Sequence, residues 1–177
     1  AVTTNNKKIY EKLKIFRSHG IKRNKSKYWK YDIVENGLIL QQVINTNNSS
    51  PREMFIYNNY LYFSNWYSSD IKKLDLNTWQ IINEIPMPGL PEDIVLLNGL
   101  LYISITMNLD WTDGDKVVTI DPEIDEIVEV FHVGNGPGDL LVYENDINFK
   151  DQGNDSFITI STPLYIATLI NRSGGSF

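Results

Sequence analysis

A pattern of 15 residues occurs three times in this chain and aligns without a gap. The copies are SPREMFIYNNYLYFS (Ser50 to Ser64), LPEDIVLLNGLLYIS (Leu90 to Ser104) and GPGDLLVYENDINFK (Gly136 to Lys150), spaced by 40 and 46 residues. Each copy has a proline at its second position, an acid at its fourth, and two apolar runs separated by a turn. A fixed period of this length indicates repeated units that pack on one another, so it constrains the fold more than any other feature of the sequence.

The second half of each unit repeats as well. Leu74-Asp75-Leu76-Asn77 aligns with Ile120-Asp121-Pro122-Glu123, and an apolar run follows each segment. Tyr31 to Val34 has the same shape, so part of an earlier unit precedes Pro51. Near the end, Asn171 stands where the other units have the Asp of this turn, which predicts that the last unit lacks its final strand. Four short strands per unit, joined by tight turns, are typical of β-propeller blades.

The sequence therefore predicts an all-β fold, a β-propeller of about three and a half to four four-stranded blades, with an incomplete ring as one outcome. The predicted segments are a basic N-terminal segment (1–27), the outer strands of a first blade (28–50), two blades (51–90 and 91–136) and a partial blade (137–177). An incomplete stack leaves apolar sheet faces open at its ends. We therefore expect a protein partner or a second copy to complete the propeller, with a longer propeller or closure by the basic segment as alternatives.

The order of these elements resembles the YVTN-type β-propeller repeat. The resemblance rests on the proline, the acid, the apolar strand, the Asn98-Gly99 turn, the LYFS and LYIS segments, and the LDLN and IDP turns. It covers Tyr28 to about Lys150 well and residues 151–177 loosely. It implies an extracellular, cell-surface or periplasmic location. It implies a fold rather than an activity, because one repeat fold carries many functions.

Charge is divided unevenly along the chain. The first 30 residues hold ten of the 16 Lys and Arg residues and one acid, whereas the remainder holds six bases and 21 acids. Such a basic segment is expected to contact an anionic partner. We favour the acidic body of the same chain, and a nucleic acid or an anionic lipid is the alternative. Within it, the spacing of Ile9, Leu13 and Phe16 predicts a short helix. No apolar run approaches the ~20 residues of a membrane span.

The predicted blade geometry gathers candidate binding residues at one end of the sheets. In a four-stranded meander, the segment that enters the innermost strand and the loop between the second and third strands lie at the same end. Three acids, Glu53, Asp93 and Asp139, stand where each inner strand begins. The loops Asn65 to Asp70 and Asn108 to Asp115 add further candidates, which are Trp66, Tyr67, Asp110, Trp111 and Asp113.

Two interpretations of these residues remain open at this point. The three acids either form a carboxylate ring for Ca²⁺ or Mg²⁺ or, as we favour, accept backbone hydrogen bonds that tie one blade to the next. No cofactor is expected, with Ca²⁺ as the alternative. The aromatic side chains either bind a carbohydrate or a peptide, or pack between neighbouring blades. The loop from Asp110 to Asp115 lacks the ligand spacing of an EF-hand.

No catalytic signature occurs in the sequence. There is no Gly-rich phosphate loop, nucleophile elbow or His-rich metal motif, and the only histidines are His19 and His132. We therefore predict a non-enzymatic binding module or a structural component of an assembly. A metal-dependent, lactonase-like or lyase-like propeller enzyme that uses Glu53, Asp93 and Asp139 is the alternative, and nucleic-acid binding through the basic segment is the second.

Overall fold

The computed structural model describes residues 21–23, 27–34, 37–150, 157–161 and 166–170. The chain divides into two units, residues 1–51 and residues 52–177, and each is described by itself. All regular elements of the described residues are β-strands. Among these residues no helix has the length and apolar character that a bilayer crossing requires. The prediction of an all-β fold is confirmed.

Unit 1 contains a three-stranded antiparallel sheet of β1 (Ile21–Arg23), β2 (Lys27–Val34) and β3 (Gly37–Asn45). Strands β2 and β3 lie where the sequence places the outer strands of a first blade. Strand β1 falls inside the basic segment, which the repeat pattern leaves out, and Lys22 pairs with Trp29 of β2. The helix predicted around Leu13 lies outside the described residues.

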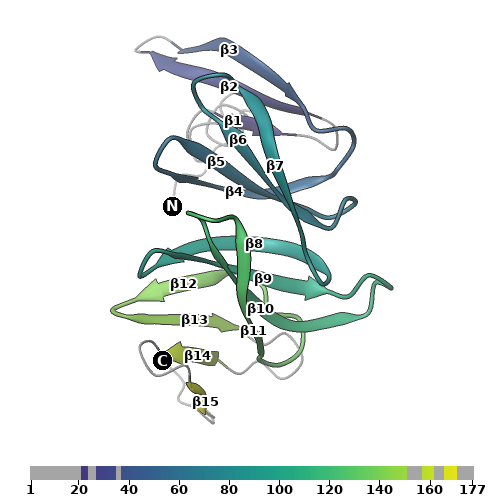
Figure 1. Ribbon diagram of the computed structural model, residues 1–177, viewed down its shortest axis with the longest axis vertical. Coiled ribbons are helices and arrows are strands. Elements are labelled where there is room, and N and C mark those ends of the chain that lie inside the picture. Colours follow the sequence, from purple (N-terminus) through teal and green to yellow (C-terminus); the bar gives the residue numbers. More distant parts are fainter. Residues whose placement is uncertain (1–20, 24–26, 35–36, 151–156, 162–165, 171–177) are drawn as a thin grey trace, which may run out of the picture. The chain divides into compact units, whose positions relative to one another are not determined.

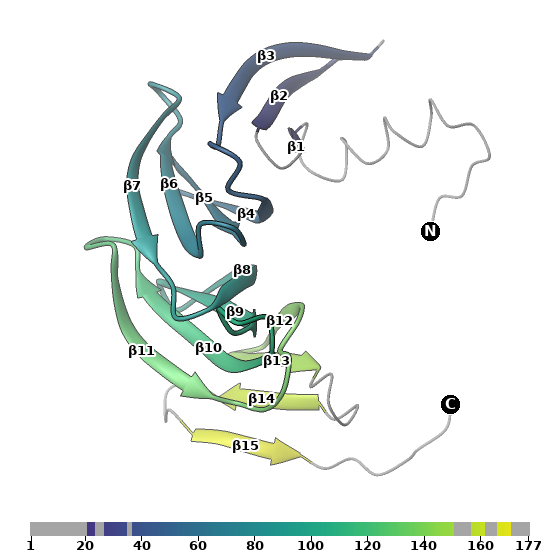
Figure 2. The same cartoon turned by 90° about the vertical axis from the view of Figure 1, so that its right-hand side faces the viewer.

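Unit 2 contains three four-stranded antiparallel sheets, each a meander whose strand order follows the chain (Figures 1 and 2). The first sheet comprises β4 (Pro51–Tyr57), β5 (Tyr60–Asn65), β6 (Asp70–Asp75) and β7 (Gln80–Pro86). The second comprises β8 (Leu90–Leu97), β9 (Leu100–Met107), β10 (Asp113–Asp121) and β11 (Glu126–His132). The third comprises β12 (Leu140–Tyr143), β13 (Asp146–Lys150), β14 (Phe157–Ser161) and β15 (Ile166–Ile170).

The third sheet corrects the prediction that the last unit lacks its final strand. Strand β14 is the third strand of this sheet, and β15 pairs with it from Phe157 opposite Ile170 to Ser161 opposite Ile166. The fourth strand therefore ends before Asn171, the residue that the turn pattern places between the third and fourth strands. All three repeats form four-stranded sheets, as propeller blades do.

Turn residues explain why each unit folds into a meander. Asn98 and Gly99, between β8 and β9, both have positive φ, 51° and 82°, which a two-residue hairpin turn requires. The turns between third and fourth strands share a side-chain hydrogen bond. The Oδ1 atoms of Asp75 and Asp121 accept the backbone N–H of the residue two positions ahead, at 2.6 and 2.9 Å. The repeats in the sequence are thus repeats of local hydrogen bonding.

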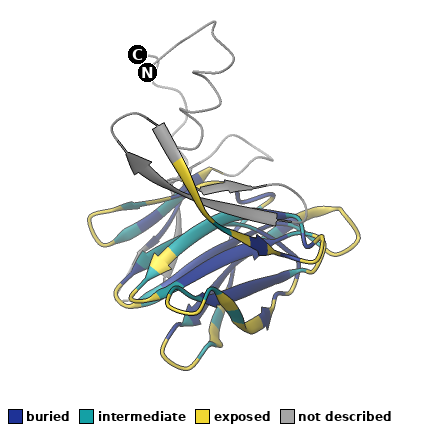
Figure 3. Ribbon diagram, turned by 90° about the horizontal axis from the view of Figure 1, so that it is seen from above, coloured by how far each residue is buried: buried dark blue, intermediate teal, exposed yellow. Residues whose placement is uncertain are grey.

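Two apolar cores lie between the sheets of unit 2. The first fills the space between the first and second sheets and includes Tyr62, Ile71, Ile94 and Ile103. The second lies between the second and third sheets and includes residues such as Leu97, Val117, Leu140, Ile147 and Ile158. The second sheet therefore buries both of its faces. Figure 3 shows buried residues along the strands and exposed residues in the turns.

Polar contacts cross the same interfaces. The buried ammonium group of Lys73 on β6 lies 2.8 Å from Asp125 Oδ1 in the turn after β10, and the hydroxyl of Tyr62 donates to the same oxygen at 3.2 Å. Burial and the Asp125 charge raise the pKa of Tyr62 well above its usual value. A carboxylate of the second sheet thus holds two side chains of the first.

Candidate functional site

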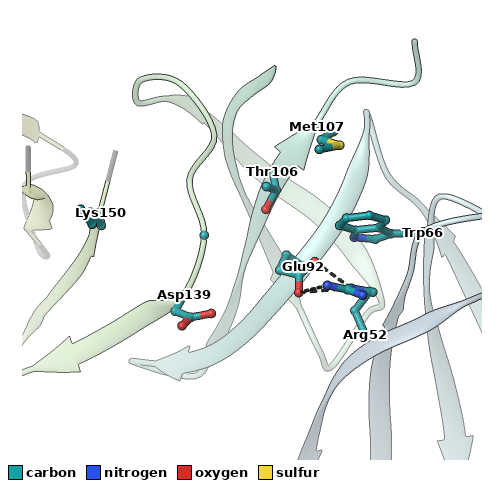
Figure 4. A pocket seen from close by; sticks show the side chains of 8 residues that line it. Arg52, Trp66, Glu92, Thr106, Met107, Asp139 and Lys150 are labelled. Carbon is teal, nitrogen blue, oxygen red and sulfur yellow. Dashed lines mark hydrogen bonds and ion pairs between the residues drawn. The ribbon is translucent and has the colours of Figure 1, made fainter. Parts of the chain in front are cut away.

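A cavity of about 410 Å³ opens at one end of the three sheets of unit 2 (Figure 4). One set of lining residues stands at or just before the start of the inner strands, and the other stands at or near the end of the second strands. The first set is Arg52, Glu92, Gly138 and Asp139, and the second is Trp66, Thr106, Met107 and Lys150. The cavity therefore lies at the end of the blades that the sequence analysis singles out.

Arg52 and Glu92 form the polar centre of this cavity. The Arg52 Nε and Nη2 atoms donate to Glu92 Oε2 and Oε1, both at 2.9 Å, in a two-pronged ion pair between the first and second sheets. The guanidinium also lies over the ring of Trp66, 4.2 Å from its centroid. A planar guanidinium suits both contacts at once. Figure 4 shows this stack, with Asp139 and Lys150 on the third sheet.

Trp66, Tyr67 and Trp111 form an aromatic cluster beside the cavity, named here the aromatic platform. The ring of Trp111 meets Trp66 at 6.0 Å and Tyr67 at 6.3 Å, both edge to face. Because Trp66 and Trp111 belong to loops of neighbouring sheets, the platform does pack between blades. Tyr67 and Trp111 are nevertheless each 54% exposed. The Nε1 atom of Trp66 is buried without a hydrogen-bond partner in the described residues.

The loop that carries Trp111 is closed by its own hydrogen bonds. The backbone N–H of Asn108 donates to Thr112 O at 2.8 Å, and that of Trp111 donates to Asn108 O at 3.0 Å. Trp111 has a φ of 67°, in the left-handed region that bulky residues rarely adopt. The turn conformation therefore does not call for a Trp at this position, and the contacts of the Trp111 ring with Trp66 and Tyr67 are its packing role in the platform.

The three repeated acids differ in what they contact. Asp93 accepts the N–H of Ile94 at 2.8 Å and that of Leu140, in the third sheet, at 2.7 Å. Among the residues that the structure describes, the Glu53 carboxylate accepts the N–H of Met54 in its own strand, at 3.0 Å, and Asp139 is exposed. Of the three, Asp93 thus makes the blade-to-blade contact that the sequence analysis favours.

Burial raises the pKa of the Asp93 carboxyl to about 6, against the opposing effect of the hydrogen bonds from Leu140 and Ile94. The charges of Glu53 and Asp139 add to the rise, so the three acids lie close enough to interact. Within the described ranges, however, no three His, Asp or Glu side chains are grouped in a way that holds a metal ion.

Asp110 and Asp113 flank Trp111 on the surface. The Oδ1 atom of Asp110 accepts the hydroxyl of Thr112 at 2.6 Å and its N–H at 3.1 Å, which lowers the pKa of Asp110. Asp113 is exposed and is the first residue of β10, so the last three residues of the predicted loop, 113–115, belong to the strand. Both residues lie close to Trp111 in the sequence, and neither is among the residues that line the cavity.

His132 stands apart from the cavity. Its Nδ1 atom lies 2.8 Å from Asp115 Oδ2 on the surface, and Lys116 contacts the other oxygen of that carboxylate. The hydrogen bond with Lys116, followed by that with His132, lowers the pKa of Asp115. His19 lies outside the described residues. His132 is thus part of a surface hydrogen-bonded cluster with Asp115 and Lys116.

Three residues of the cavity, Arg52, Glu92 and Lys150, are not among the candidates that the sequence pattern indicates. A signal for the first pair was present, because Arg52 and Glu92 occupy the same position in consecutive repeats and carry opposite charges. Equivalent positions of neighbouring blades lie side by side, so opposite charges there predict an ion pair across the interface. Lys150 replaces the Ser that ends the other two copies of the pattern, Ser64 and Ser104.

Comparison with known proteins supports the fold and goes no further. No protein-family profile matches the sequence, and no curated protein does. Solved structures do match, among them three with TM-scores of 0.56 to 0.67. They are dihydro-heme d1 dehydrogenase NirN in complex with DHE (11% identity, TM-score 0.67), Kuenenia stuttgartiensis hydrazine synthase (15%, 0.59) and Kluyveromyces lactis Hsv2p (12%, 0.56).

The matches cover 86%, 78% and 85% of this chain, respectively, but only 34%, 38% and 45% of those chains. The sequence thus spans between a third and a half of the length of the structures that it matches. These structures are β-propellers, and the four-stranded antiparallel sheets described above are the blades of such a fold. The chain has a β-propeller fold, and an incomplete ring is consistent with the share of the matched chains that it covers.

Proposed function

We propose that this chain is a YVTN-like β-propeller that acts as a non-enzymatic interaction module at a cell surface or in the periplasm. Its binding site is the cavity together with the aromatic platform, and its ligand is a peptide segment of a protein partner. No cofactor takes part. The location follows from the resemblance of the repeat.

One observation carries this proposal: the cavity is lined largely by residues that the repeats do not share. The shared residues, such as Pro51, Pro91 and Pro137, build every blade alike. The position after these prolines is Arg52, Glu92 and Gly138 in turn, and all three line the cavity. Residues that build the fold recur in each blade, whereas residues that serve a single site need not.

The residue types support a protein ligand. Arg, Trp and Tyr dominate the energetic centres of protein–protein interfaces, and Arg52, Trp66, Tyr67 and Trp111 gather here. The polar groups of the cavity centre are already paired with each other, as in the Arg52–Glu92 contact. A site of this kind offers flat contact surface and fixed hydrogen-bond geometry rather than a reactive group.

Selection from a peptide library tests the proposal. We expect the chain to select dodecapeptides that bind with micromolar or better affinity, with EDTA having no effect. The double variant Trp66→Ala with Trp111→Ala should lose at least 30-fold in affinity, whereas Trp79→Ala, at the turn between β6 and β7, should not. Binding of a glycan array in place of any peptide, or loss of binding with EDTA, would contradict the proposal.

A second surface supports association through sheet faces. Leu141 and Tyr143 of β12 are 63% and 64% exposed. Their equivalents in the first sheet, Phe55 and Tyr57, pack against the core of the next interface. The equivalents in the second sheet, Val95 and Leu97, do the same. We therefore also propose that a further blade covers this face of β12. In a solution that contains only this chain, a second copy supplies that blade.

A further inference from the structure

We infer that the aromatic platform binds a cationic side chain, arginine or lysine, of the partner peptide. This inference rests on the proposed function and specifies the ligand chemistry at the same site. Three observations carry it: the charges around the platform, a cation already stacked on one of its rings, and the backbone at Trp111.

The charges around the platform favour a cation. Residues 52–177 carry six Lys and Arg residues against 19 Asp and Glu residues. Two acids, Asp110 and Asp113, flank Trp111 in the sequence, and Asp139 lines the same cavity as Trp66. The local bases are Arg52, which Glu92 pairs, Lys116, which pairs with Asp115 and contacts Asn108 of the Trp111 loop, and Lys150. Acids therefore exceed bases at the site, and the positive charge of Arg52 is neutralised in place.

The platform already holds one cation. The Arg52 guanidinium lies 4.2 Å from the centroid of Trp66, and elsewhere in unit 2 the Lys73 ammonium lies 4.3 Å from that of Tyr60. Such contacts are attractive because the face of an aromatic ring is negatively polarised. Trp111 meets Trp66 edge to face and is half exposed, so it extends the same kind of surface toward solvent.

The backbone conformation at Trp111 does not itself require a tryptophan side chain. Gly or Asn adopts a φ of 67° at less cost than Trp. Trp79 has a similar φ, 59°, in the turn between β6 and β7. The two residues therefore form a matched pair of test positions. Replacement by Asn lowers the cost of the same backbone conformation at both, but only Trp111 belongs to the platform.

The test uses a hexapeptide that alternates arginine and glycine, and an analogue in which citrulline replaces each arginine. Citrulline keeps the shape of the side chain and removes the charge. Binding is followed by the indole N–H signals of the protein labelled with ¹⁵N-tryptophan. We expect the arginine peptide to bind at least threefold more tightly than the citrulline peptide and to shift the Trp111 signal, a ratio that a modest cation–π contact supplies.

Variants locate the effect. Trp111→Asn should abolish the threefold preference, whereas Trp79→Asn should leave it unchanged. Asp110→Asn with Asp113→Asn should weaken arginine binding and reduce its salt dependence while the citrulline affinity stays constant. Both asparagine variants at the tryptophans should unfold at the same or a higher denaturant concentration than the wild type, which excludes misfolding as the cause.

Each result separates this inference from the proposed function. Equal affinities of the two hexapeptides, or a preference that survives Trp111→Asn, would overturn the inference and leave the function standing. The same holds if neither hexapeptide binds while library-selected peptides do. If no library peptide binds either, the proposed function fails with it.

Discussion

The carboxylate of Asp93, at the start of one inner strand, accepts the backbone N–H of Leu140, at the start of the next, over 2.7 Å. The other oxygen of this carboxylate accepts the N–H of Ile94 in its own strand. The backbone N–H of Asp93 donates in turn to the hydroxyl of Ser104 at 3.0 Å. Through its carboxylate and its backbone N–H together, Asp93 thereby links the entrance of β8 to β9 and to the next sheet.

The first prediction concerns the pH dependence of stability. The pKa of Asp93 is about 6 in the folded protein, above the usual 3.8, so the folded state binds this proton more tightly than the unfolded state. The contribution of Asp93 to the free energy of unfolding therefore rises as pH falls from about 7 to 4, by at most about 3 kcal/mol. Urea unfolding at pH 7.5, 6 and 5 measures it.

The matched variant is Asp93→Asn, which removes the titration but keeps a side-chain oxygen. We expect the difference in unfolding free energy between wild type and variant to change with pH between 4 and 7. A difference that is constant across this range would show that Asp93 has an ordinary pKa.

The second prediction concerns the contact of Lys73 with Asp125. Both side chains are largely buried, so removing the carboxylate leaves the ammonium group of Lys73 without its counter-charge. Asp125→Asn should reduce the free energy of unfolding by roughly 2–4 kcal/mol, while Asn still tolerates the positive φ of this position. Asp115→Asn, which breaks a surface pair with Lys116, should cost less than about 1 kcal/mol. Equal losses in the two variants would contradict the burial argument.

The third prediction uses the repeat as a guide to a stabilising change. Glu144 has a φ of 57°, whereas the equivalent residues Asn58 and Asn98, with φ of 52° and 51°, are of a type that adopts this region readily. Glu144→Asn should raise the free energy of unfolding by roughly 0.5–1 kcal/mol. The same replacement at Glu126, an exposed position in β11 with ordinary φ, should not stabilise. Chemical denaturation measures both variants. A lower free energy of unfolding for Glu144→Asn would contradict the view that the positive φ of Glu144 destabilises the turn.

The fourth prediction concerns the exposed face of β12. If a second copy covers Leu141 and Tyr143, sedimentation velocity should show association that increases with protein concentration. The double variant Leu141→Glu with Tyr143→Glu should sediment as a monomer. Leu109→Glu, at an equally exposed position in the loop after β9, should leave association unchanged. A wild-type monomer at every concentration would rule out association through this face.

The sequence predicts the blades well because each blade depends on local signals. Asn98 and Gly99 predict their turn from residue type alone, and the turn that begins at Asp121 is built by its own side chain. The same reasoning misplaced the last strand. No Asp or Asn lies between Ser161 and Ile166, so the turn pattern passes over this connection and points to Asn171 instead.

The site was predictable only in part, because it depends on contacts between blades. The loop tryptophans could be picked out as candidates, since large aromatic residues in a polar loop are conspicuous. That Trp66 would stack on Arg52 could not, because Arg52 lies in a strand and its partner Glu92 lies 40 positions away. The unequal roles of Glu53, Asp93 and Asp139 were also out of reach, since equivalent positions in a sequence say nothing of burial.

The strands of each sheet lie side by side in the order in which they occur along the chain, and this order affects folding during synthesis. Hydrogen-bonded partners such as Leu90 and Met107 are close along the chain, so a sheet can form as soon as its own residues have left the ribosome. The apolar side chains on its far face, Leu97 and Val117 among them in the second sheet, then remain open until the next inner strands emerge. We therefore expect the blades to form one after another during synthesis, and the open face of each new blade to be the surface that chaperones and wrong partners meet.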